Sequence, residues 1–153
     1  MERSAPTIAG AAPSRVDELY RGGMRIDHLG LGVPDVGVAK AYYDDLMPLV
    51  GYVREWEIGY RPNDRHGAQI FLYPTLDDGD YSRHRVGLQH ISFHVPTRAD
   101  VHRVYEWAAE RSHEIIEHPR LFPEYHKHFY ATFFLDMHGF MLEAVTFEEP
   151  DAG

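Results

Sequence analysis

Glu143 is a carboxylate inside an otherwise apolar segment, FMLEAVTF at 140 to 147. The apolar, β-rich composition of this segment predicts a strand, and burying an unpaired carboxylate in a strand is costly. The charge can be compensated by a salt bridge to an arginine, by an outward-facing place on an edge strand, or by a metal or catalytic role. The segment by itself leaves these alternatives open.

A weak internal repeat adds two histidines to this carboxylate. The segment HLGLGVPD at 28 to 35 lies over HISFHVPT at 90 to 97, so that His28 matches His90. Each copy alternates apolar with small or polar residues, which predicts two strands with the histidine on the face opposite the core. Pseudo-symmetry would bring both imidazoles to one cleft, and two imidazoles with one carboxylate form a facial ligand set for a divalent metal.

The other histidines are less informative. His126 and His128, in YHKHFY, share one strand face and fit either a local ligand pair or a rim that contacts substrate. The segment HEIIEH at 113 to 118 lacks the spacing of a zinc-protease helix, so it predicts a helix end that enters a strand. Several further histidines are expected in solvent, namely His66, His84, His102 and His138.

The elements that must position these residues also occur twice. A helix with apolar spacings of three and four follows the first repeat copy, and a second helix begins after a capping-box-like pair, Thr97 and Asp100. Each helix is followed by β-rich sequence, so the unit is strand, helix, then two or three strands. The third strand of the first unit is expected to be short, because little sequence separates Gly59 from Gly67.

Composition and charge exclude several classes of function. The chain has 153 residues, 15 Lys plus Arg against 24 Asp plus Glu, a net charge of -9 and no basic run, so nucleic acid and anionic membranes are poor partners. It has no cysteine, no apolar run of the roughly 18 residues that span a bilayer and no hydrophobic signal core, which favours a cytoplasmic protein. We expect a tail at 1–23, one domain at 24–148 with modules at about 24–80 and 86–148, and a tail at 149–153.

Residues 24–148 resemble the vicinal oxygen chelate superfamily, which includes glyoxalase I, fosfomycin- and bleomycin-resistance proteins and extradiol dioxygenases. The segments that carry the resemblance are IDHLGLGVPDVGVAKAYYDDLMPLVGY, GLQHISFHVPTRADVHRVYEWAAE and FYATFFLDMHGFMLEAV. The resemblance implies an α+β fold of two paired βαβββ modules that form a curved mixed sheet around a cleft. It also implies a divalent metal (Fe, Mn, Zn or Ni) held by His28, His90 and Glu143, and a homodimer in which the cleft is sometimes completed across subunits.

The sequence departs from the best-known relatives at two places. In glyoxalase-like members a fourth ligand, Glu or Gln, comes from the strand before the second module, and Phe71 stands there instead. This speaks against the proton transfer of glyoxalase I. Phe133 falls on the tyrosine of the extradiol signature and Met137 on its proline, which weakens the case for ring cleavage.

The sequence therefore predicts a divalent-metal-dependent lyase, isomerase or dioxygenase that acts on a small oxygen-bearing organic molecule. The alternatives are a metal-free small-molecule-binding or resistance protein of the same fold and an accessory dimer without a small-molecule site. Retention of both histidines and the glutamate favours the enzyme. Catalytic candidates are His126, His128 and Tyr130, and the substrate-binding candidates are Phe71, Tyr73, Phe129 and Phe133.

Overall fold

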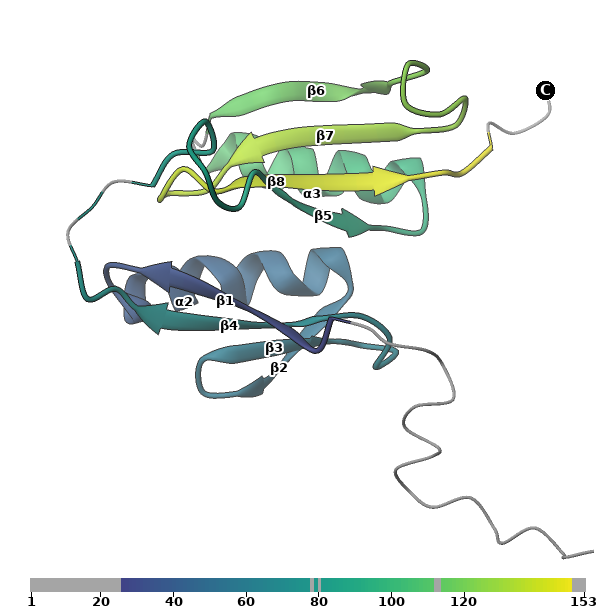
Figure 1. Ribbon diagram of the computed structural model, residues 1–153. Coiled ribbons are helices and arrows are strands. Elements are labelled where there is room, and N and C mark those ends of the chain that lie inside the picture. The colour runs from purple at the N-terminus through teal and green to yellow at the C-terminus, as the bar shows by residue number, and fades with distance from the viewer. Residues whose placement is uncertain (1–25, 78, 80, 112–113, 150–153) are drawn as a thin grey trace, which may run out of the picture.

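The computed structural model describes residues 26–77, 79, 81–111 and 114–149, which form two modules of the same design (Figure 1). Each module contains one α-helix and one four-stranded mixed sheet, so the predicted α+β repeat is confirmed, with the curved sheet divided into two. The tail expected at 1–23 and all but one residue of the tail expected at 149–153 lie outside the described residues. None of the described helices is long and apolar enough to cross a membrane.

The first module has its strands in the order β1-β4-β3-β2. β1 pairs with β4 in parallel, and the other two pairings are antiparallel. β3 is the short strand that the sequence predicted, since only two of its residues pair with β4. The elements are β1 (His28–Val33), α2 (Val36–Leu46), the 3-10 helix η1 (Met47–Val50), β2 (Tyr52–Trp56), β3 (Gly59–Pro62) and β4 (Gln69–Pro74).

The second module repeats this topology with the strand order β5-β8-β7-β6. β5 pairs with β8 in parallel, and β8 lies between β5 and β7 in the interior of the sheet. The elements are β5 (Ile91–His94), α3 (Arg98–Glu110), β6 (Ile115–Leu121), β7 (Tyr130–Leu135) and β8 (Met141–Thr146). The described part of HEIIEH, residues 114–118, leads into β6 as expected, and His113 lies outside the described residues. The helix end expected in this segment is wrong, because α3 ends at Glu110.

Both helices begin at side chains that satisfy the first free backbone N–H groups. The Asp35 side chain accepts a hydrogen bond from the Val38 N–H at 2.9 Å and so caps α2. Thr97 and Asp100 form the predicted capping box at the start of α3. Each helix then packs its apolar face on its own sheet, and one core cluster includes residues of both modules.

A buried hydrogen bond joins the two modules. The Tyr43 hydroxyl, on α2, donates to Asp136 Oδ2 at 2.7 Å, and the β7–β8 turn donates two backbone N–H groups, of His138 and Phe140, to Asp136 Oδ1 at 2.9 Å each. Gly139 closes this turn at φ +83°, a conformation that L side chains rarely adopt. Asp136 is 5% exposed, and burial raises the pKa of its carboxyl above the usual value although the three hydrogen bonds lower it.

We expect Tyr43→Phe to lower the free energy of unfolding by about 1–3 kcal/mol, because it removes the hydroxyl from a buried carboxylate. Tyr105→Phe is the matched control, since the Tyr105 hydroxyl contacts His118 in an exposed position. Urea denaturation at neutral pH measures both variants. Equal midpoints for Tyr43→Phe and the parent protein would show that the bond between the modules does not contribute to stability.

Candidate metal and substrate site

Glu143 lies on an interior strand, with its side chain on the face of the second sheet that points away from α3. In the β8 register it is opposite Ser92 of β5 and Phe133 of β7, while its neighbours Leu142 and Ala144 are in the main core. The residue is 2% exposed. An outward-facing place on an edge strand is therefore ruled out as the explanation of this carboxylate.

The contacts of Glu143 leave one oxygen without a partner. Its Oε2 atom is 3.2 Å from His90 Nε2, whereas Oε1 is buried and has no hydrogen-bond partner among the described residues. Burial raises the pKa of the Glu143 carboxyl above its usual value, and the Ser92 hydroxyl and the His90 imidazole lower it in part. Among the described residues, the side chain paired with Glu143 is a histidine and not an arginine, so no Arg salt bridge there compensates this charge.

His28 and His90 are held in the same way, as the repeat would require. His28 Nδ1 contacts Asp27 Oδ2 at 2.7 Å, and His90 Nδ1 contacts the side-chain oxygen of Gln89, the residue that matches Asp27 in the repeat. Because carboxylate and amide oxygens only accept, each contact favours the tautomer with its proton on Nδ1. The Nε2 lone pair of each imidazole is then available as a metal ligand.

A cavity of about 570 Å³ lies over His90 and Glu143. Its walls are mainly aromatic, and every residue that lines it belongs to the second module. The lining residues are Gln89, His90, Ser92, His94, Tyr125, Phe129, Phe133, Met141, Glu143, Val145 and Phe147. Small-molecule sites commonly combine such an apolar wall with a few polar groups.

The first sheet carries the second half of the predicted site on its own outer face. His28 contacts Phe71 edge-on at 5.6 Å, and the Phe71 ring lies between those of Trp56 and Tyr73 at 5.1 and 6.3 Å. Phe71 can lie flat across β3 only because Gly59 has no side chain, since a Cβ atom there would be 2.5 Å from the ring. This face therefore presents an imidazole beside a strip of aromatic rings.

Phe71 is the structural counterpart of Glu143. In the first sheet Gly30 is opposite Phe71, and in the second sheet the matching residue, Ser92, is opposite Glu143. The register thus agrees with the sequence prediction that Phe71 stands where related proteins have a fourth ligand. Each module of this chain supplies one histidine, but only the second supplies a carboxylate.

The described part of one chain does not bring His28 to His90 and Glu143. No cluster of three or more potential His, Cys, Asp or Glu ligands exists among the described residues. In Figure 1 the arrowheads of β1 and β5 point to opposite sides, and His28 begins β1 while His90 directly precedes β5. The predicted cleft shared by both histidines, which the sequence allows within one chain or across a dimer, therefore stays a prediction.

The catalytic candidates from the sequence separate into two groups. The His126 ring is 5.6 Å from that of Phe147, which lines the cavity, and His128 Nε2 is 3.4 Å from Glu149 Oε1 beside the same rim. Tyr130 instead lies on the α3 face of β7, where its hydroxyl is 2.8 Å from His102 Nε2. Tyr130 and Phe133 are an odd number of residues apart on one strand, so they point to opposite faces, and the assignment of Tyr130 to the site is corrected.

The predicted substrate-binding residues are likewise divided between the modules. Phe129 and Phe133 line the cavity, whereas Phe71 and Tyr73 belong to the outer face of the first sheet. The sequence did not predict several other residues that line the cavity. Most of them are two or four residues from Glu143 or Ser92 and so share a strand face with one of these residues, and Tyr125 comes from the β6–β7 loop. Period-two spacing could have identified Met141, Val145, Phe147 and His94, whereas Tyr125 had no such signal.

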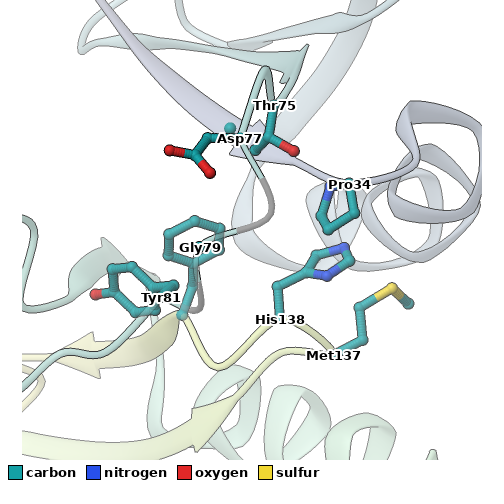
Figure 2. Close-up of a pocket in the computed structure, with 9 residues that line it drawn as sticks. Pro34, Thr75, Asp77, Gly79, Tyr81, Met137 and His138 are labelled. Atoms are coloured by element: carbon teal, nitrogen blue, oxygen red, sulfur yellow. The ribbon is translucent and has the colours of Figure 1, made fainter.

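A larger cavity of about 810 Å³ lies where the two modules meet, and it contains none of the predicted site residues. Figure 2 shows the His138 ring there beside Pro34, with Met137, Tyr81 and Asp77 around the same space. His138 is half-buried, and its Nε2 atom has no partner among the described residues, so its expected place in solvent is wrong. The other three histidines expected in solvent, His66, His84 and His102, are exposed.

Comparisons with known proteins agree with this architecture. Residues 25–149 match the family model of the Glyoxalase/Bleomycin resistance protein/Dioxygenase superfamily. No curated protein sequence matches the chain.

Several solved structures share the fold. A protein of Bacillus halodurans described as a glyoxalase is 23% identical with a TM-score of 0.64, and the match covers 84% of this chain and 98% of that one. A glyoxylase/bleomycin resistance protein/dioxygenase domain from Frankia sp. is 22% identical with a TM-score of 0.62, covering 80% and 97%. The fosfomycin resistance protein FosX from Listeria monocytogenes is 13% identical with a TM-score of 0.59, covering 80% and 93%.

Glu143→Gln should raise the free energy of unfolding by about 1 kcal/mol in the presence of a chelator, because the amide keeps the shape of the side chain and removes the buried charge. Glu106→Gln, on the exposed side of α3, is the control for loss of a carboxylate in solvent. Thermal and urea unfolding give the comparison. A less stable Glu143→Gln protein would indicate that the carboxylate is already fully compensated in the metal-free chain.

Proposed function

Because the chain belongs to the Glyoxalase/Bleomycin resistance protein/Dioxygenase superfamily, we propose that it is a divalent-metal-dependent enzyme acting on a small oxygen-bearing molecule. The observation that carries the proposal is the Glu143 carboxylate, which is buried, has one oxygen without a partner and faces His90. Such an arrangement costs stability unless something compensates it. The reaction would be that of a lyase, an isomerase or a dioxygenase.

The donor set fits a divalent ion of the iron, manganese, zinc or nickel type. Two imidazoles and one carboxylate suit these metals, and both imidazoles have their Nδ1 atoms held by a neighbouring oxygen, the usual arrangement behind a histidine ligand. Bound there, the ion would act as a Lewis acid and stabilise negative charge on a substrate oxygen.

The third ligand would come from a second copy of the chain. Within one chain the outer face of the first sheet offers His28 and the outer face of the second sheet offers His90 and Glu143, in separate places. In a two-fold symmetric homodimer, the outer face of the first sheet of one copy would lie over the outer face of the second sheet of the other copy. Each of the two equivalent clefts would then contain His28 of one copy with His90 and Glu143 of the other. The dimer would also cover the aromatic strip of Trp56, Phe71 and Tyr73, in which Trp56 and Tyr73 are exposed and Phe71 is half-buried.

The residues of the chain then have distinct tasks. His90 and Glu143 hold the reacting end of the cavity, where the Phe133 ring lies 6.3 Å from the His90 ring and keeps water away. His126 is the imidazole at the rim that would move a proton, because His128 is engaged by Glu149. Phe129 and Phe133 form the wall against which an organic substrate packs.

The second candidate is a metal-free small-molecule-binding or resistance protein of the same fold. Its supporting observation is that the aromatic cavity is formed by the second module alone. Such a protein would bind its ligand without metal and would have no use for the unpartnered oxygen of Glu143.

Elemental analysis of protein purified without chelator should find about one metal ion per chain. We expect His28→Ala, His90→Ala and Glu143→Ala each to lose it, while His66→Ala, an exposed histidine that contacts only Asp64 in the described structure, keeps it. The enzyme proposal fails if the parent protein binds none of iron, manganese, zinc or nickel. Metal retained in all three site variants would mean that the ligands are elsewhere.

Mixing two inactive variants distinguishes a shared site from a site within one chain. If His28→Ala and Glu143→Ala chains are unfolded together and refolded, about half of the dimers contain one chain of each kind, and each of these has one intact site. We expect metal to return to about a quarter of an ion per chain in the mixture. A mixture that binds no more metal than the separate variants would place all three ligands in one chain.

A further inference from the structure

The cavity beside Glu143 has aromatic walls and no fixed positive charge. Its lining includes the rings of Phe129, Phe133, Tyr125 and Phe147, and none of the described residues that line it is Lys or Arg. The Phe129 and Phe147 rings meet edge to face at 5.5 Å, so the wall is already packed. Its ionisable groups are one carboxylate, two imidazoles and the phenol of Tyr125.

Nearby guanidinium groups are not available to a ligand in this cavity. Arg120 lies 3.7 Å above the Phe122 ring, behind the aromatic wall, and it is paired with Glu117 at 3.1 Å and Glu124 at 3.8 Å. Arg98 lies over Tyr130, on the opposite face of the sheet. The two guanidinium groups near the cavity therefore interact with other side chains, Arg120 with Glu117 and Glu124 and Arg98 with the Tyr130 ring.

The outer face of the first sheet, which the proposed dimer would bring to this cavity, adds ring surface of the same kind. The Trp56, Phe71 and Tyr73 rings follow one another with interplanar angles of 38° and 35°. Arg61, on the neighbouring strand, is ion-paired with Glu55. This face contributes planar apolar surface and an already paired guanidinium.

We infer that the site selects an uncharged, planar aromatic molecule and rejects a carboxylate or phosphonate of the same shape. The inference rests on the proposed function, because it names the substrate class of that site. A charged group on the ring, remote from the oxygens that would face His90 and Glu143, would lose its hydration among Phe129, Phe133 and Phe147 without gaining a Lys or Arg partner from the lining. A neutral ring gains offset or edge contacts with Phe129, Phe133 and Phe147 and can direct its oxygen atoms toward His90.

Binding by a matched pair of ligands tests the inference. We would compare dihydroxybenzamide with dihydroxybenzoate, each with adjacent hydroxyl groups, by calorimetry in chelator at one pH at which the benzoate is ionised. The two molecules differ in charge and hardly in shape. We expect the amide to bind at least about tenfold more tightly than the carboxylate, and a cyclohexane diol with adjacent hydroxyls to bind more weakly than the amide because it is not planar.

A charge inserted on the cavity floor should reduce the discrimination. His94 is exposed, lines the cavity and stacks on Phe147 with an interplanar angle of 23°, a position that a planar guanidinium can also occupy. We expect His94→Arg to strengthen benzoate binding at least about fivefold relative to the parent protein. His84→Arg, which adds the same charge at an exposed histidine outside the cavity, is the control and should leave the preference for the amide unchanged.

Equal or tighter binding of the carboxylate by the parent protein would overturn the charge selection, and equal binding of the cyclohexane diol would overturn the aromatic selection. Failure of all three ligands to bind would overturn both. Metal content of protein purified without chelator separates this inference from the proposed function. Metal bound through His28, His90 and Glu143 without ligand discrimination refutes only the inference, whereas discrimination without any metal refutes the enzyme proposal and leaves a metal-free binding protein.

Discussion

The arrangement of the site depends on one electrostatic constraint, the burial of the Glu143 carboxylate on an interior strand. The charge is desolvated, a single imidazole faces it, and one oxygen has no partner among the described residues. Apolar packing would favour a neutral side chain at this position, since the strand is buried along its whole length. A locally unfavourable residue at the centre of a well-packed sheet is typical of a functional position, where stability is given up for chemistry.

The internal symmetry of the chain explains why the candidate site has two equivalent histidines, and a break in that symmetry explains why it has only one carboxylate. Two modules of one topology place His28 and His90 in equivalent positions, each with an oxygen of the preceding side chain at Nδ1. The symmetry is broken where Phe71 takes the place of a second carboxylate and lies flat over Gly59. Under the proposed function, the two half-sites on separate faces of one chain would become a complete site only when another chain adds the missing half, which makes assembly part of the proposed chemistry.

Much of this could be predicted from the sequence, because period-two alternation and the repeat fix the faces of strands. They predicted His28 and His90 on the face opposite the core, and both residues are exposed. The same rule, applied strictly, would have excluded Tyr130, whose odd spacing from Phe133 turns it toward α3. The relative placement of the modules was not predictable, since it depends on contacts such as Tyr43 with Asp136 between residues far apart in the chain.

A metal site shared by two copies of the chain is tested most directly by growing crystals of the protein with manganese or zinc and measuring the anomalous scattering of the metal. We expect one strong anomalous peak per chain, at about 2.0–2.2 Å from a Glu143 oxygen and His90 Nε2 of one copy and from His28 Nε2 of the other. A peak bonded to other residues, such as His126 and His128, or no peak near a buried and still unpartnered Glu143, would contradict it.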